Sequence, residues 1–139
     1  MKGFIAGAHD LLHAGHLATL EEAKSQCDYL IVGLHSDPTI DRPQKNRPVQ
    51  TVYERFVQLK GCKFVDEIIP YDTEEDLVNM LQMVKPDVRF LGEDYRGQPF
   101  TGSELAIKII YTSRRHNFSS SGLRKRIENA KNLNSNTNS

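Results

Sequence analysis

The feature that most constrains this chain is a junction near its amino terminus, where a short apolar run ends and a helical pattern begins within one turn. The run covers residues 3–8, and the helical pattern begins at Gly15. His13 and His16 stand at the expected mouth of that helix. The first N–H groups of a helix have no partner within the helix, and the helix dipole is positive there. The junction therefore predicts an anion site on an α/β fold.

Length and composition set limits on what the chain can be. Its 139 residues, 38% of them hydrophobic, fit one compact domain. Lysine plus arginine equals aspartate plus glutamate, 18 each, so no long-range attraction to nucleic acid or to an anionic membrane is indicated. Cys27 and Cys62 fit neither a metal-ligand spacing nor a disulfide framework. Without a leader or an apolar run near 20 residues, we expect a soluble cytoplasmic protein.

The order of apolar patterns predicts the fold class. Short apolar runs, typical of strands buried on both faces of a sheet, predict strands at 3–8, 29–34, 65–70, 88–91 and 106–111. Helical spacing of apolar residues predicts helices at 15–26, 51–62, 74–84 and 123–131. We expect a Rossmann-like, doubly wound, five-stranded parallel sheet with helices on both faces. Ligands of such folds bind beyond the carboxyl ends of the strands, where we expect all the loops discussed below.

Two loops and a tail complete the expected organisation. Residues 36–48 are rich in proline, aspartate and cations, which is typical of an exposed loop that is either a lid or disordered. Residues 92–102 form a second, glycine-rich loop. Residues 132–139 are asparagine and serine with little apolar content, so we expect a disordered tail after a catalytic domain of residues 1–131.

The stretch GAHDLLHAGH, residues 7–16, resembles the H-x-G-H signature of the nucleotidylyltransferase superfamily, and within it the cytidylyltransferase family that includes the glycerol-3-phosphate enzymes. Further segments resemble the same family in the same order. They are Lys45 in the proline-bounded loop, VYERF with Arg55, Lys63 before FVDEIIP, LGEDYRG, and Arg114 before NFSSSGLRKRI. The resemblance covers residues 2 to about 128, nearly the whole expected domain.

The resemblance implies a function and a set of site residues. It implies transfer of CMP from CTP to a small phosphorylated alcohol similar to glycerol 3-phosphate, with release of pyrophosphate, in a homodimer. Mg²⁺ would be bound mainly through the triphosphate, and no residue is expected to bind metal directly. The implied catalytic residues are His13, His16, Lys45 and Arg114. The implied nucleotide-binding residues are Gly7, Ala8, His9, Asp10, Gly15, Gly92, Asp94, Arg114, Ser119 and Ser120. The implied acceptor-binding residues are Arg55, Lys63 and Asp66.

Elementary chemistry supports this kind of site independently of the resemblance. A phosphate monoester has a second pKa near 6, so at neutral pH it is already largely a dianionic nucleophile and needs no general base. The reaction instead needs alignment of two anions that repel each other, and neutralisation of the charge that builds on the α-phosphate. Histidine, lysine, arginine and helix N-termini meet that need.

Several of these residues also have a purely structural interpretation. Asp10 either orients a histidine, or holds a magnesium-bound water, or stabilises a turn or helix start. Lys45 either closes over the phosphates or is simply solvated. Arg55 is either an acceptor ligand or an ion-pair partner on a surface helix. Asp66 is equally well a strand-edge aspartate, and Ser119 an ordinary helix cap.

Two departures from the family pattern leave the nucleotide and the acceptor open. Residues 7–10 read GAHD where the family usually has GTFD, so a hydroxyl that would bond phosphate is lost at Ala8. Residues 114–120 read RRHNFSS where the family usually has RTxGIST. Two alternatives therefore stand beside CMP transfer: an adenylyltransferase that uses ATP with the same chemistry, and a nucleotide-binding module without turnover.

Overall fold

The computed structural model describes residues 1–113 and 120–137. Strands and helices alternate through most of this part of the chain. The strands are β1 (Lys2–Gly7), β2 (Tyr29–His35), β3 (Glu67–Tyr71), β4 (Val88–Gly92) and β5 (Lys108–Thr112). The α-helices are α1 (Ala14–Lys24), α2 (Val52–Lys60), α3 (Glu74–Val84) and α4 (Ser120–Thr137), with 3-10 turns η1 (Pro38–Ile40) and η2 (Glu93–Tyr95).

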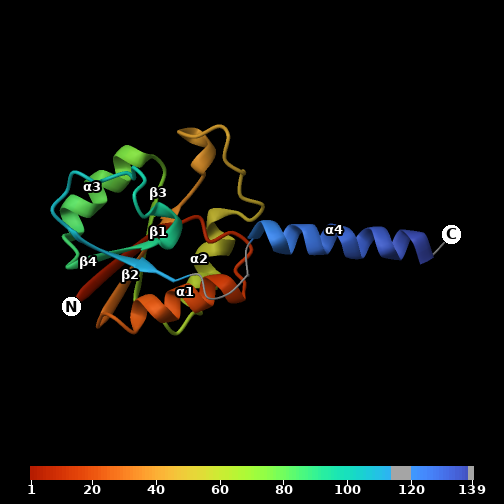
Figure 1. Ribbon diagram of the computed structural model, residues 1–139, viewed down its shortest axis with the longest axis horizontal. Coiled ribbons are helices and arrows are strands. Elements are labelled where there is room, and N and C mark those ends of the chain that lie inside the picture. Colours follow the sequence, from red (N-terminus) through yellow and green to blue (C-terminus); the bar gives the residue numbers. More distant parts are fainter. Residues whose placement is uncertain (114–119, 138–139) are drawn as a thin grey trace.

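The described strands form one parallel sheet in the order β3-β2-β1-β4-β5 (Figure 1). The chain moves from β1 towards β3 on one side and then returns to place β4 on the other side of β1. The strand order therefore reverses between β1 and β4, which is where ligands bind in folds of this kind. This confirms the predicted Rossmann-like fold with its five-stranded parallel sheet.

Alternating side chains of the central strands give the sheet two apolar faces. Ile5 packs with α1 and α2 residues such as Leu20 and Leu59 on one face. Phe4 packs with α3 residues such as Leu77 on the other face. In Figure 1, α3 accordingly lies across the sheet from α1 and α2. Helices on both faces bury the strands, which explains their nearly unbroken apolar sequence.

The helix starts follow capping rules. Thr51 accepts a hydrogen bond from the backbone N–H of Glu54, whose side chain in turn accepts from the N–H of Thr51, and Thr73 begins α3 in the same way. α3 ends at Lys85, which adopts a left-handed conformation with φ 51°. The following proline cannot continue a helix, so the end predicted at residue 84 is the observed one.

The last helix is longer than its sequence pattern predicts. α4 begins at Ser120 and continues through Thr137, whereas the apolar pattern predicts a helix over 123–131 and a tail from residue 132. Asparagine and serine cost a helix only about 0.5 kcal/mol each relative to alanine, so an established helix runs on through them. In Figure 1, α4 points away from the layers of the sheet. No helix within the described residues is long and apolar enough to cross a membrane.

Candidate active site

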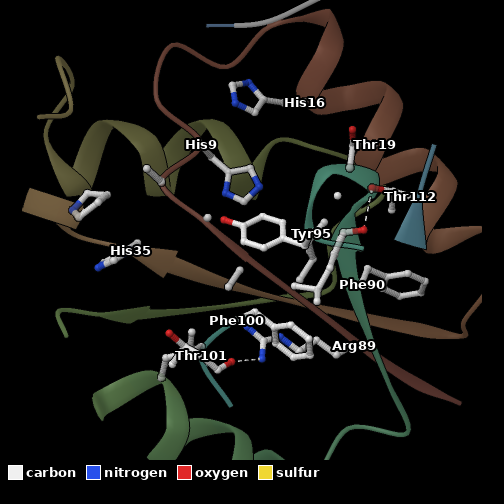
Figure 2. Close-up of a pocket in the computed structure, with 18 of the residues that line it drawn as sticks. His9, His16, Thr19, His35, Arg89, Phe90, Tyr95, Phe100, Thr101 and Thr112 are labelled. Carbon is white, nitrogen blue, oxygen red and sulfur yellow. Dashed lines mark hydrogen bonds between the residues drawn. The ribbon is translucent and has the colours of Figure 1, made fainter. Parts of the chain in front are cut away.

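A cavity of about 470 Å³ opens at the carboxyl edge of the sheet, over β1 and β4 (Figure 2). We call its two walls the α1 side and the α3 side. The α1 side is formed by residues around the start of α1 and the end of β5, namely His9, His13, His16, Thr19 and Thr112. The α3 side is formed by residues next to α3 and on the loop after η2, namely Arg42, Tyr71, Glu74, Leu77, Arg89, Phe100 and Thr101.

The two histidines of the H-x-G-H sequence cap the helix that they begin. His13 is the N-cap residue of α1, and its Nδ1 accepts a hydrogen bond from the backbone N–H of Gly15 at 2.9 Å. The Nδ1 of His16 accepts from the backbone N–H of His13 at 3.2 Å. The pair therefore forms a reciprocal capping box in which imidazoles replace the usual hydroxyl and carboxylate.

This capping fixes where each imidazole carries its proton. A ring that accepts through Nδ1 is neutral and holds its hydrogen on Nε2. Burial, followed by the nearby rings of His9 and His13, lowers the pKa of His16 to about 3, so this ring is neutral at pH 7. The ring centres of His13 and His16 lie 4.1 Å apart on the cavity wall. The α1 side thus presents two neutral Nε2–H donors beside a helix N-terminus.

His9, predicted to bind nucleotide, lies deeper in the same wall. Its backbone is left-handed with φ 50°, its side chain is 9% exposed, and its Nδ1 has no hydrogen-bond partner. Burial lowers its pKa to about 4, in spite of a hydrogen bond to the backbone of Gly7. The ring centre lies 5.5 Å from that of His16. A neutral aromatic ring here lies beneath His16 (Figure 2).

Asp10 connects three segments of the chain. Its carboxylate accepts from the backbone N–H groups of Val49 at 2.8 Å and Gln50 at 2.9 Å, and from the Nη2 of Arg124 on α4. Burial alone would raise the pKa of Asp10, but these amides and the charge of Arg124 outweigh it, and the pKa is lowered. Asp10 is not among the residues that line the cavity. Its observed contacts are those of a brace between loops, and its predicted contact with nucleotide stays a prediction.

Arg55 is buried rather than part of a surface ion pair. It is 1% exposed, and its guanidinium donates to the carbonyl oxygens of Ala8 at 3.0 Å, His35 at 2.6 Å and Ser36 at 2.6 Å. The Nε donates to the carbonyl of Gln50 at 3.1 Å. These bonds hold the ends of β1 and β2 together beneath the cavity. The surface-helix interpretation is wrong, and the predicted acceptor-binding role stays a prediction.

The loop between β2 and α2 brings cations to the cavity. Lys45 lines it, as predicted, and its backbone N–H donates to the carbonyl of Arg42 at 2.9 Å. Arg42, which sequence reasoning missed, reaches Glu74 at 3.3 Å and the hydroxyl of Thr101 at 3.4 Å. It stands in the proline-rich loop of residues 36–48, and the density of cations in that loop was the available signal.

Arg89 is a second residue that the sequence analysis missed. It stands inside β4, is 4% exposed and lines the cavity, and its Nη1 donates to the carbonyl oxygen of Thr101. Its guanidinium carbon lies 5.5 Å from the ring centre of Phe100 (Figure 2). A single charge within the apolar strand VRFLG was the signal that would have found it.

The remaining predicted nucleotide-binding residues divide into three groups. Those that line the cavity are Gly7, Ala8, Gly15 and Gly92. Asp94, in η2, does not line it, although its neighbour Tyr95 does. Ser120 begins α4, while Arg114 and Ser119 lie outside the described residues.

Two predicted acceptor residues lie at the opposite edge of the sheet. Lys63 and Asp66 precede β3, so they stand at the amino ends of the strands. The Nζ of Lys63 lies 5.3 Å from the ring centre of Phe64, and the carboxylate of Asp66 accepts from Lys24 and from the N–H of Leu30. The expectation that every selected loop shares the carboxyl edge is therefore wrong for these two. Only loops that follow a strand reach that edge of a parallel sheet.

The side chains offer little to a metal ion by themselves. The described residues contain no group of three or more histidine, cysteine, aspartate or glutamate side chains placed to hold one. Among those that line the cavity, Glu74 supplies the carboxylate, and it pairs with Arg42. Mg²⁺ commonly binds through substrate phosphates with only one or two protein carboxylates, and this is the arrangement that the residues fit.

Comparisons with known proteins find one family match and several relatives of similar sequence. A family model described as cytidylyltransferase-like matches residues 4–126. A bifunctional protein HldE of Campylobacter concisus is 36% identical over 130 residues, which are 93% of this chain and 27% of that protein. HldE of Helicobacter hepaticus is 33% identical over 92% of this chain. The chain thus spans about a quarter of the length of these curated relatives.

Solved structures share the fold. A lipopolysaccharide core biosynthesis protein of Thermoplasma volcanium is 30% identical, with a TM-score of 0.70 over 84% of this chain and 98% of its own. A pantoate-beta-alanine ligase of Francisella tularensis, complexed with beta-gamma ATP and beta-alanine, is 21% identical. Its TM-score of 0.59, over 88% of this chain and 64% of its own, shows likeness of fold.

Proposed function

The chain belongs to the cytidylyltransferase-like family of nucleotidyltransferases, and from this premise we propose that it transfers a nucleotidyl group to a small phosphorylated sugar or alcohol. The observation that carries the proposal is the pair of neutral Nε2–H donors of His13 and His16 at the start of α1. They share one cavity with the cations Arg42 and Lys45. This is the charge distribution that a triphosphate and a second phosphate require.

In the proposed reaction, a phosphate oxygen of the acceptor attacks the α-phosphorus of a nucleoside triphosphate. The bond from the α-phosphorus to the oxygen that bridges to the β-phosphate breaks, and pyrophosphate leaves. His13 and His16 donate hydrogen bonds to the α-phosphate and the departing oxygen as charge builds there. Lys45 and the N–H groups of α1 neutralise the triphosphate. Arg114, Ser119 and Ser120, which the resemblance implies as nucleotide-binding residues, would contact the β- and γ-phosphates.

We favour ATP over CTP as the nucleotide. The curated relatives described above are HldE proteins, and the solved relative at 30% identity is named for lipopolysaccharide core biosynthesis. The departures at Ala8 and at residues 114–120 also remove parts of the cytidylyltransferase pattern. An acceptor of the sugar phosphate class fits this set of relatives better than glycerol 3-phosphate.

Two further parts of the proposal rest on the family alone. Mg²⁺ would be carried by the oxygens of the triphosphate, where it would neutralise charge on the leaving pyrophosphate. The homodimer expected from the resemblance stays a prediction.

Pyrophosphate release, measured with each of the four nucleoside triphosphates and a panel of phosphorylated sugars and alcohols, tests the proposal. We expect release with ATP and at least one sugar phosphate. Release with CTP and not with ATP would restore the cytidylyl alternative. Tight nucleotide binding by calorimetry without any release would favour a module without turnover, and neither binding nor release would refute the proposal.

A further inference from the structure

Arg89 is a charged side chain held within the sheet. It is 4% exposed, and among the described residues it forms no ion pair with a carboxylate. One hydrogen bond to the carbonyl of Thr101 and the stacked ring of Phe100 are its polar and aromatic contacts (Figure 2). A buried cation without a counter-charge is strongly unfavourable. An anion bound from the cavity would remove that cost.

The guanidinium of Arg89 presents one free edge. Nη1 is used by Thr101, whereas Nε is buried with no hydrogen-bond partner, and Nη2 forms no hydrogen bond within residues 1–113 and 120–137. The Nε–H and the adjacent Nη2–H point in parallel and match the two oxygens of a carboxylate or phosphate. Arg89 lines the cavity, so its guanidinium retains donor capacity for an oxyanion that binds there.

A second arginine of the α3 side contacts the same threonine. The Nη2 of Arg42 lies 3.4 Å from the hydroxyl of Thr101, while Arg89 bonds its carbonyl. Among the described cavity residues, Arg42, Lys45 and Arg89 are cationic, and Glu74 is the carboxylate. The α3 side of the cavity therefore carries an excess of positive charge that does not depend on the histidines.

The position of Arg89 separates it from the reacting end of the site. Arg89 pairs in register with Phe4, whereas Gly7, which lies against the His9 ring, ends β1 three residues later. At about 3.3 Å per residue, these levels differ by about 10 Å along the strand. Gly102 lies between the guanidinium of Arg89 and helix α3. A Cβ placed on Gly102 would lie 3.0 Å from the Nη1 of Arg89 and 3.1 Å from the side chain of Leu81, which is in α3. A group held by Arg89 is therefore distinct from the phosphate that reacts near the histidines.

We propose that Arg89, assisted by Arg42, binds a second anionic group at the far end of the acceptor, so that the acceptor class is a phosphorylated sugar or polyol with an additional carboxylate or phosphate. This inference rests on the proposed function, because it names the acceptor for the same cavity. The reacting phosphate would lie at the carboxyl edge, and the second anion would lie on the α3 side.

Three hexose derivatives provide the probes. Glucose 6-phosphate has a neutral far end, 6-phosphogluconate carries a carboxylate there, and fructose 1,6-bisphosphate carries a second phosphate. Binding of each to the full chain is measured by calorimetry in the presence of a non-hydrolysable ATP analogue. We expect one of the two ligands with an anionic far end to bind roughly 10- to 100-fold more tightly than glucose 6-phosphate. The ligand that binds more tightly shows whether the second anionic group is a carboxylate or a phosphate.

The variant Arg89→Gln tests the residue itself. It should abolish that preference while leaving the affinity for glucose 6-phosphate within about threefold. Arg89→Lys should restore only part of the preference, because lysine keeps the positive charge but lacks the paired N–H donors of the guanidinium. Arg96→Gln is the matched control. Arg96 also stacks on an aromatic ring, Tyr111, at 4.3 Å, but it lies outside the cavity lining and pairs with Glu93.

Several results would overturn the inference. These are equal affinity for all three probes, no binding of any probe to the wild-type protein, or an unchanged preference in Arg89→Gln. An equal loss for all three probes would mean that Arg89 only braces the Thr101 loop. If Arg89→Gln does not fold, the wild-type preference and Arg89→Lys decide the question. Pyrophosphate release is scored separately, so absent release with an intact preference refutes only the proposed function.

Discussion

The two sides of the cavity are built in different ways. On the α1 side, His13, Gly15 and His16 form their contacts within a single turn of helix. On the α3 side, Arg42 meets Thr101 across 59 residues of sequence. The α1 side consists of neutral donors fixed by helix capping, and the α3 side of charges brought together by the tertiary fold.

This difference suggests a division of labour between the two sides. A helix start with its caps is a unit that short sequence determines, so the chemistry it supports is shared by chains with the same motif. Contacts between distant loops change with every insertion or substitution in those loops. We therefore assign the transfer chemistry to the α1 side and the choice of acceptor to the α3 side.

The largest expected effect concerns the α1 side alone. His16→Ala removes one Nε2–H donor and should lower kcat for pyrophosphate release by about 10²- to 10³-fold, with little change in KM for either substrate. His16→Asn should retain more activity, because its amide can still accept from the N–H of His13 and donate to phosphate. An unchanged kcat in a His16→Ala protein that circular dichroism shows to be folded would contradict the assignment of the transfer chemistry to the α1 side.

Arg55 tests the support that joins the ends of β1 and β2. Arg55→Met leaves the carbonyls of Ala8, His35 and Ser36 without their donor, so the free energy of unfolding should fall by about 3 kcal/mol in urea denaturation. The matched control is Arg47→Met. The Arg47 side chain is 84% exposed, so its loss should cost within about 0.5 kcal/mol. Equal losses for the two variants would contradict the bracing role.

Acid should weaken the α1 side selectively. Burial lowers the pKa of His9 from 6.5 to about 4, so below pH 6.5 the unfolded chain binds a proton that the folded chain does not. The contribution of His9 to the free energy of unfolding is therefore fully present above pH 6.5. It falls by up to about 3 kcal/mol as the pH drops towards 4.

The variant His9→Asn isolates that contribution, since asparagine tolerates the left-handed backbone at φ 50°. Unfolding free energies measured between pH 7 and pH 4.5 should show a shallower slope for the variant. A slope that matches the wild type would mean that His9 does not titrate as described.

The smallest effect concerns the α3 side. Gly97 and Gly102 both have positive φ, at 76° and 84°, so alanine at either should cost about 1 kcal/mol of stability. A Cβ at Gly97 would meet nothing within 4 Å, whereas one at Gly102 would press on Arg89 and Leu81. Only Gly102→Ala should therefore also weaken acceptor binding in calorimetry. If Gly97→Ala weakens it equally, the contact with Arg89 is not the cause.

The sequence predicted the sheet and the α1 side well because both depend on local patterns. Apolar runs located the strands, and the spacing of His13 and His16 located the capped start of α1. It did not predict Arg42 and Arg89 as partners, since their common contact, Thr101, lies in a loop without a regular pattern. Lys63 and Asp66 were assigned to the site by resemblance, although they precede a strand and so belong to the other edge.

The central strand β1 acquires its two neighbours at different times. Gly3 pairs with Leu30 on β2 and with Val88 on β4, whose residues are synthesised much later. At about 5 to 20 residues per second, a ribosome takes roughly 3 to 12 s to pass from one partner to the other. During that interval the nascent chain exposes one open edge of its central strand, which is a site for aggregation. Chaperone demand during translation should therefore be greatest just before β4 emerges.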